Sequence, residues 1–270
     1  MTMDTLALSD NEFKKFRGMI YEAAGISMSD AKKPLVSGRL AKRIRQRGLT
    51  SYSAYFDTLM NDRHEFQTAV DLLTTNETYF FREPKHFEFL RTVILPSCRD
   101  HSSLRIWSGA CSTGEEPYTL ALVLADVLGM RPWEIFASDI STRVLEKARQ
   151  GQYPLEDAEG IPKPLLHKHC FKGIGQNTGT FIVDPALAAR ITFQQINLNT
   201  RLPDVGQFDV IFLRNVMIYF DNDTKRQVVQ RLLHHLRPGG YFLVSHSESL
   251  NGITEALKMV KPSIYQKPHD

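Results

Sequence analysis

The first 73 residues carry apolar side chains at helical spacing and contain no run typical of a strand. A possible capping box of Ser9 and Glu12 precedes the first such stretch, whose apolar positions are Phe13, Phe16, Met19 and Ile20. Three further helices are predicted, from Pro34 to Gly48, over residues 52–60 and over residues 65–73. We therefore predict an all-α helical domain over residues 1–73.

Beyond residue 73, short apolar runs alternate with amphipathic stretches. The runs predict strands at residues 104–107, 133–139, 192–196, 208–213 and 241–245, and the stretches predict helices at 115–128, 142–150 and 224–236. A further helix carries Phe87, Leu90 and Ile94 and is expected to end at Pro96. This alternation is typical of a doubly wound α/β domain, here residues 74–270, whose mostly parallel sheet has helices on both faces.

One segment interrupts the alternation of strands and helices. Between Gly151 and Arg190 the chain contains glycines, prolines and the apolar run 181–183. These features predict a small antiparallel β insertion at about residues 152–190.

Composition and charge argue against a membrane-spanning, secreted or disulfide-rich protein. Of the 270 residues, 42% are hydrophobic and 23% are charged, and the formal net charge is +3, as in an ordinary globular protein. No run approaches the roughly 20 apolar residues that span a bilayer, and the N-terminus lacks the basic start of a signal peptide. The cysteines, Cys98, Cys111 and Cys170, are widely spaced, which argues against disulfides and structural zinc. We expect a cytoplasmic chain that does not insert into a membrane.

Positive charge is concentrated in one predicted helix. Residues 31–47 contain no acidic side chain but seven basic ones, which are Lys32, Lys33, Arg39, Lys42, Arg43, Arg45 and Arg47. Such a helix can contact phosphates or an acidic protein surface, and it can equally be a solvated face. Neither interleaved aromatic residues nor zinc-ligand spacing accompanies the charges, so we expect no nucleic-acid partner.

The loop after the first strand of the α/β domain has the glycines of a ligand-binding turn. It covers residues 108–114 (SGACSTG) and leads into a helix. A P-loop needs a lysine after its last glycine, but this chain has Glu115 and Glu116 there, and two carboxylates would repel a triphosphate. A dinucleotide fingerprint needs a glycine where this chain has Cys111. The loop therefore favours a ligand with positive charge and no phosphate.

S-adenosylmethionine has these properties, because it carries an ammonium, a sulfonium and an adenosine. Glu115 or Glu116 can bind the ammonium, and Asp139, at the end of the second strand, can accept bonds from both ribose hydroxyls. Asn197 and Asn215 also follow predicted strands, at the edge where open parallel sheets bind ligands. The alternative is structural, with acids stabilising a helix N-terminus and asparagines in ordinary turns.

Histidine and serine motifs give weaker signals. His167, His169 and the pair at 234–235 lack companion ligands at metal spacing, so we expect no metal. Residues 245–248 (SHSE) have the composition of a catalytic triad, but neighbours on a strand would point to opposite faces. His86 is expected to pack on or within a helix.

Three stretches resemble the CheR family of chemotaxis receptor methyltransferases. They are residues 76–83 (NETYFFRE), 107–118 (WSGACSTGEEPY) and 214–220 (RNVMIYF), and the likeness extends over essentially the whole chain. The resemblance implies a class I S-adenosylmethionine-dependent methyltransferase domain with an inserted β-subdomain, behind a helical domain that docks on the receptor. It assigns that docking to the basic side chains of residues 31–47.

The same resemblance implies roles for individual residues. The residues expected to bind the cofactor are Asn76, Thr78, Arg82, Gly109, Glu116, Asp139, Asn197, Leu198, Asn215 and Val216. Arg82 would face the carboxylate of the cofactor, Glu116 its ammonium and Asp139 its ribose. Arg82 and Tyr219 are the expected catalytic residues, with Tyr219 near the transferred methyl group, and both would orient the reactants rather than transfer protons.

We therefore predict methyl transfer from S-adenosylmethionine to glutamate side chains of transmembrane chemoreceptors, giving γ-methyl esters and S-adenosylhomocysteine. A glutamate has a pKa of about 4.3 and is already an anion at neutral pH, so the reaction needs no general base. The expected partners are the cytoplasmic domains of receptors, in membrane receptor arrays. For the insertion two alternatives stay open: some members of the family bind a receptor C-terminal peptide there by strand addition, and others lack this interaction. Two alternatives are a methyltransferase of a small molecule or RNA and a non-catalytic signalling adaptor.

Overall fold

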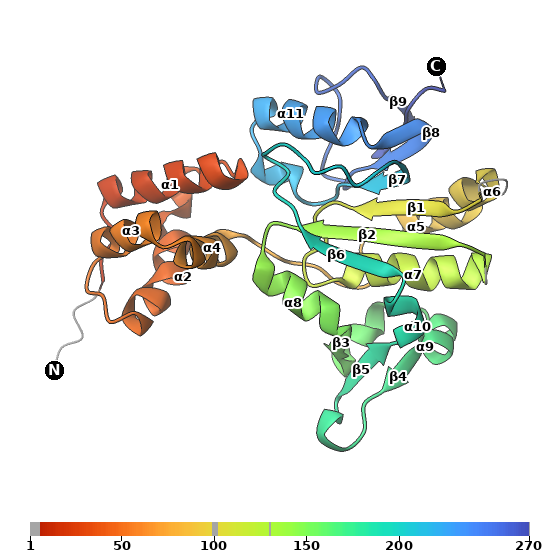
Figure 1. Cartoon of the computed structure of the whole chain (residues 1–270), viewed down its shortest axis with the longest axis horizontal. Coiled ribbons are helices and arrows are strands. Elements are labelled where there is room, and N and C mark those ends of the chain that lie inside the picture. The colour runs from red at the N-terminus through yellow and green to blue at the C-terminus, as the bar shows by residue number, and fades with distance from the viewer. Residues whose placement is uncertain (1–5, 99–101, 130, 270) are drawn as a thin grey trace. The chain divides into compact units, whose positions relative to one another are not determined.

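The computed structural model describes residues 6–98, 102–129 and 131–269, which fall into two compact units (Figure 1). Met1–Thr75 and Tyr219–Thr224 make up the first unit, and Asn76–Ile218 and Lys225–Asp270 make up the second. No helix in the described ranges combines the length and the apolar character that crossing a membrane requires.

The first unit is helical, as the apolar spacing predicts. Its elements are α1 (Asp10–Ala24), the 3-10 turn η1 (Asp30–Lys32), α2 (Lys33–Gln46), α3 (Tyr52–Asn61) and α4 (Arg63–Leu73). Ser9 and Glu12 form the predicted capping box, and Gly25 ends α1 in the left-handed conformation with a φ of 71°. The buried ring of Phe16 packs against the rings of Tyr52 and Tyr55, so the apolar stripes of α1 and α3 meet in one core.

A short segment from much further along the chain completes the helical unit. Ile26 and Phe220 form an isolated antiparallel bridge, and the Ser27 N–H donates to the Tyr219 carbonyl over 2.8 Å. The sequence pattern places all residues after 73 in the α/β domain. The structure instead returns Tyr219–Thr224 to the helical unit, through backbone contacts that no local pattern encodes.

The second unit is built on a seven-stranded sheet with the strand order β6-β2-β1-β7-β8-β10-β9. The strands are β1 (Leu104–Ser108), β2 (Trp133–Asp139), β6 (Ile191–Gln195), β7 (Phe208–Phe212), β8 (Leu236–Leu243), β9 (Lys258–Lys261) and β10 (Ile264–Gln266). From β6 to β8 all neighbours are parallel, whereas β10 and β9 are antiparallel. This confirms the mostly parallel α/β sheet, and the strand order reverses between β1 and β7, where such sheets bind ligands.

Helices cover the sheet and bury its central strands (Figure 1). Helix α7 (Glu115–Leu128) packs against β2, and α8 (Thr142–Gln150) packs against β2 and β6. A further helix, α11 (Asn222–Leu233), precedes β8. Every residue of β7 is buried, as expected for a central parallel strand that has no solvent face.

Two predictions about elements were wrong. Pro96 does not end a helix: α5 (Lys85–Phe89) continues through a π-helical turn, η2 (Leu90–Ile94), into α6 (Leu95–Ser97), which contains Pro96. A π-helical turn is an irregularity that can accommodate the missing N–H of a proline. In addition, β8 already begins at Leu236, and β9 and β10 were not predicted, because such short strands show too little alternation to be recognised.

The predicted antiparallel insertion is present. Strands β3 (Gln152–Pro154), β5 (Thr180–Val183) and β4 (Cys170–Lys172) pair in the order β3-β5-β4. They are connected by η3 (Leu155–Gly160), α9 (Lys163–His169) and η4 (Gly175–Asn177), and α10 (Pro185–Ala188) leads back to the main sheet. The rings of Tyr153 and Phe181 pack on Phe80, which anchors the small sheet to the α/β unit.

Candidate cofactor site

The loops that carry most of the predicted site residues leave the same edge of the large sheet. The Gly109 N–H donates to the Phe212 carbonyl over 2.8 Å, which ties the end of β1 to the end of β7. The Ile196 N–H donates to the Asp139 carbonyl over 3.0 Å, which ties the end of β6 to the end of β2. These strand ends therefore form one continuous edge, as the parallel pairing requires.

The glycine loop lies close to its neighbours. A Cβ at Gly114 would lie 2.7 Å from the Tyr153 hydroxyl oxygen, and this glycine has a φ of 100°. A Cβ at Gly109 would lie 3.3 Å from the Phe212 carbonyl oxygen. The path of the loop therefore requires glycine at position 114, where the positive φ adds a second reason, and leaves only a tight fit for a Cβ at position 109.

Asp139 fixes the shape of the glycine loop. Its side chain is buried, and its two oxygens accept the N–H groups of Ser112 and Ser141, each over 2.9 Å. The Ser112 hydroxyl donates to the Asn76 carbonyl over 3.1 Å, so the structure brings Asn76, Ser112 and Asp139 together. Asp139 therefore ties the glycine loop to the end of β2.

The structure distinguishes the two acids that follow the glycine loop. Glu115 is buried, accepts the Thr113 hydroxyl over 2.7 Å, and has a pKa that burial raises above its ordinary value. Glu116 is only partly buried and accepts the Ser108 hydroxyl over 2.7 Å. Glu115 is therefore engaged within its own loop, whereas Glu116 is bonded to the last residue of β1.

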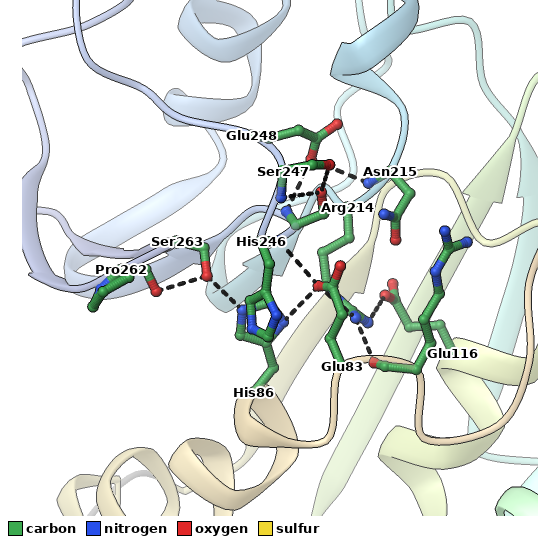
Figure 2. Close-up of polar contacts among 12 residues, drawn as sticks. Glu83, His86, Glu116, Arg214, Asn215, His246, Ser247, Glu248, Pro262 and Ser263 are labelled. Carbon is green, nitrogen blue, oxygen red and sulfur yellow. Dashed lines mark hydrogen bonds and ion pairs between the residues drawn. The ribbon is translucent and has the colours of Figure 1, made fainter.

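Arg214 holds Glu116 in place, a role that the sequence did not indicate. Its side chain is 2% exposed, and its Nη1 donates to Glu116 over 2.7 Å while its Nη2 donates to Glu83 over 3.0 Å (Figure 2). Nη2 also contacts the Arg82 carbonyl. A guanidinium between two carboxylates has a fixed geometry, so it orients Glu116. Its partners are 98 and 131 residues away in sequence, and no local pattern reveals them.

Arg82 lies in an irregular turn directly before α5. The residues on either side, Phe81 and Glu83, have φ values of 56° and 58°, which is unusual for non-glycine residues. The Arg82 Nη1 donates to the Glu77 carbonyl over 2.6 Å, and the guanidinium carbon lies 5.6 Å from the centre of the Tyr79 ring. Thr78 is partly buried in the same turn. A guanidinium has five donors, so Arg82 can also bind a carboxylate.

The predicted adenine and methionine residues lie in two other loops. The Asn197 side chain accepts the Asn199 N–H over 2.9 Å, an Asx turn that would by itself explain an asparagine after β6. Leu198 is buried, and its carbonyl accepts from Arg231 over 3.0 Å. Asn215 and Val216 follow β7 and are partly buried. Tyr219 ends the 3-10 turn η5 (Met217–Tyr219) and belongs to the helical unit.

One group of metal-type ligands is found in the part of the chain that the structure describes. Glu83, His86 and His246 offer ligand atoms that all lie within 4.8 Å of one another (Figure 2). However, Oε2 of Glu83 already accepts from Arg214 over 3.0 Å and from the His246 N–H over 3.3 Å. A divalent cation bound at that oxygen would be repelled by the guanidinium, so we interpret the group as part of an ion-pair network.

Two interpretations of histidine and serine residues change. Residues 245–248 form a turn after β8, not a strand, so the argument from alternating faces was wrong. Ser245 and Ser247 instead bond to each other through their hydroxyls over 2.9 Å. His86 is 1% exposed, and its Nε2 lies 2.7 Å from the Ser263 hydroxyl, so it is packed inside the domain as expected.

The basic residues of α2 do not all face solvent. Arg39 donates to the carbonyls of Leu73 and Thr74, and Arg43 forms a two-point ion pair with buried Glu65 over 2.6 and 2.7 Å. The exposed basic side chains of the run are Lys32, Lys42, Arg45 and Arg47. Arg39 and Arg43 therefore bind within the helical unit. Two more of the seven also form ion pairs there, Lys33 with Asp10 over 2.6 Å and Arg47 with Asp62 over 3.8 Å.

Comparison with known proteins identifies relatives over almost the full length. Residues 76–266 match the family described as CheR methyltransferase, SAM binding domain, and residues 11–74 match CheR methyltransferase, all-alpha domain. The chemotaxis protein methyltransferase of Salmonella typhimurium is 40% identical over 270 residues, covering 98% of this chain and 93% of that protein. Chemotaxis protein methyltransferase 2 of Pseudomonas aeruginosa is 42% identical over 257 residues, covering 94% and 92%.

Similarity to solved structures is more distant. The N-methyltransferase NodS from Bradyrhizobium japonicum, in complex with S-adenosyl-L-homocysteine, has 13% sequence identity and a TM-score of 0.42. The match covers 79% of this chain and 98% of that one.

Proposed function

The chain belongs to the CheR methyltransferase family, and from that premise we propose that it methylates glutamate side chains in the cytoplasmic domains of chemoreceptors. It is a methyltransferase of chemotaxis that uses S-adenosylmethionine. The products of the proposed reaction are glutamyl γ-methyl esters and S-adenosylhomocysteine. The acceptor is the glutamate carboxylate, and the residues that we assign to the reaction are given below.

The observation that carries the assignment of the site is the distribution of charge in the loops at the sheet edge. Arg82 supplies a cation in the turn before α5, whereas Glu116 supplies a carboxylate at the start of α7 and Asp139 supplies one at the end of β2. S-adenosylmethionine has the matching groups, namely a carboxylate, an ammonium and a ribose diol. Its sulfonium supplies an electrophilic methyl group, and the side chains present fit the groups around it.

For this reaction the protein has to bind and orient the two reactants and exclude water from them. The acceptor glutamate is an anion at neutral pH, so no side chain has to remove a proton. Charge is neutralised as the carboxylate meets the sulfonium, and a site with little water favours this change. Correct placement of the two reactants can lower the barrier by several kcal/mol, on the order of the effective molarities of intramolecular reactions. We assign this placement to Arg82 and Tyr219.

Two surfaces support contact with receptors. The exposed Lys32, Lys42, Arg45 and Arg47 on and beside α2 form a basic face that suits an acidic protein surface. In the small sheet, β4 is an edge strand and carries Phe171, which is 53% exposed, so a receptor C-terminal peptide could pair there by strand addition. Docking through these surfaces would recruit the enzyme to receptor arrays in the membrane.

The test is transfer of a labelled methyl group from S-adenosylmethionine to receptor-containing membranes. We expect label on the receptor that is released as methanol in mild base, since esters are base-labile, and mapped peptides that carry it on glutamate. Stable label, or label on RNA or a small molecule, would contradict the proposed acceptor. Receptor binding without transfer of label would instead indicate a signalling adaptor.

A further inference from the structure

Glu248 is a carboxylate with three backbone hydrogen bonds and no part in the proposed chemistry. Figure 2 shows its side chain beside Asn215. Its Oε2 accepts the Ser245 N–H over 2.8 Å and the Asn215 N–H over 3.1 Å. Its Oε1 accepts the Ile218 N–H over 3.2 Å. One side chain thus binds amides from two loops, the turn after β8 and the loop after β7.

Closure of its own turn does not explain this arrangement. The bond to Ser245, together with the Glu248 N–H that donates to the Ser245 carbonyl over 3.0 Å, would be sufficient to close residues 245–248. The other two bonds reach amides that are 33 and 30 residues earlier in the chain. Both carboxylate oxygens are used, and a side-chain amide could not replace them because its NH2 group donates instead of accepting.

In the loop after β7, one of these two positions has an unfavourable backbone conformation and the other is exposed. Asn215 has a φ of 58°, in the left-handed region that costs energy for any residue with a Cβ. The Ile218 side chain is 50% exposed, so packing does little to hold it. Charge-assisted bonds from an anion to the amides of both residues fix this loop at two points.

We infer that Glu248 is a positioning residue that holds the loop after β7 at Asn215 and Ile218. The inference rests on the proposed function, in which Asn215 and Val216 bind the methionine part of the cofactor and Tyr219 directly follows Ile218. Arg214, immediately before this loop, is anchored separately by Glu83 and Glu116. Glu248 therefore pre-organises the backbone from Asn215 to Ile218, the segment that follows the anchored Arg214.

The variant Glu248→Gln tests this role, because it keeps the length of the side chain but loses the charge and one acceptor. We expect the dissociation constant for S-adenosylhomocysteine, measured by calorimetry, to rise about tenfold. Hydrogen exchange should accelerate in peptides that cover residues 213–219 and remain unchanged in α7, a local effect that general destabilisation would not give. The matched control is Glu255→Gln, an exposed carboxylate in the same C-terminal region, which should behave like the unaltered chain.

Asn215→Ala separates this inference from the proposed function. Weaker binding in Asn215→Ala with unchanged binding in Glu248→Gln would overturn the role of Glu248 and leave the proposed site intact. Unchanged binding in both variants would overturn the assignment of Asn215 and the inference with it. If Glu248→Gln does not fold, hydrogen exchange is measured in the unaltered chain without ligand. Protected amides at Asn215 and Ile218 would support the positioning role of Glu248, and unprotected amides would overturn it.

Discussion

Arg82 is the one cation among the residues assigned to the cofactor, and it lies in a turn with positive φ values on both sides. Arg82→Ala should raise the dissociation constant for S-adenosylhomocysteine by about 10- to 100-fold, because charge-assisted hydrogen bonds to the ligand carboxylate are lost. Calorimetry measures this directly. Arg91→Ala is a suitable control, since Arg91 pairs with Asp126 on α7. Unchanged affinity in Arg82→Ala would remove Arg82 from the site.

His86 makes the stability of the α/β unit sensitive to acid. Burial, and next the charge of Arg214, lower the pKa of His86 from 6.5 to about 3. Between these two pH values the unfolded chain binds a proton that the folded chain excludes. The contribution of neutral His86 is therefore complete above pH 6.5 and decreases as the pH falls towards 3, by up to about 1.4 kcal/mol per pH unit.

The variant His86→Gln should lose the part of the acid sensitivity that arises from His86 and keep the part that arises from carboxyl groups. Urea unfolding between pH 7 and 4.5 should give a free energy of unfolding that falls less steeply with decreasing pH than in the unaltered chain, by up to about 1.4 kcal/mol per pH unit. The exposed His167 provides a control, because His167→Gln should keep the original slope. Parallel curves for the unaltered chain and His86→Gln would contradict the prediction.

Among the helices, α2 and α4 are joined by the ion pair of Arg43 with Glu65. Glu65 is 1% exposed, and hydrogen bonds from Arg43 hold the pKa of its carboxyl group below the ordinary value. Arg43→Met leaves this carboxylate buried without its main partner, so the helical unit should lose about 2–3 kcal/mol of unfolding free energy at neutral pH. Thermal unfolding checks this, with the exposed Arg45→Met as the control.

The pH dependence of this difference has a definite sign. The lowered pKa of Glu65 means that its stabilising contribution is present above pH 4.5 and is lost as the pH falls below that value. The difference between the unaltered chain and Arg43→Met should therefore shrink in acid. A difference that is constant from pH 7 to pH 4 would show that Arg43 acts through packing of its hydrocarbon chain instead.

For the molecule as a whole, the basic face of α2 should affect the rate of methylation without affecting cofactor binding. The double variant Lys42→Glu, Arg45→Glu should lower the methylation rate of receptor membranes by about tenfold at low salt, and less at high salt, because electrostatic attraction is screened. Affinity for S-adenosylhomocysteine should not change. Arg63→Glu on α4 is exposed and serves as the control. An equal loss in both variants would argue against α2 as the docking face.

Much of the architecture, and the kind of cofactor, follows from local patterns. Helical spacing places the first four helices, and apolar runs identify the parallel strands, because both periodicities belong to contiguous residues. The acids after Gly114 exclude phosphate ligands by charge alone, which already favours S-adenosylmethionine. Local patterns did not predict the short strands β9 and β10 or the continuation of the helix through Pro96, because these features depend on partners elsewhere in the fold.

Contacts between distant segments were decided only by folding. Arg214 reaches Glu116 and Glu83 across 98 and 131 residues, Glu248 reaches Asn215 across 33, and His86 meets Ser263 across 177. In the sequence, Arg43 is one of seven basic residues expected to dock on the receptor. In the structure, it pairs with Glu65 of α4. The chemistry of each side chain is local, whereas its partners depend on how strands and helices pack. The kind of ligand could therefore be predicted from residue types, whereas the partners of Arg214 and Glu248 could not.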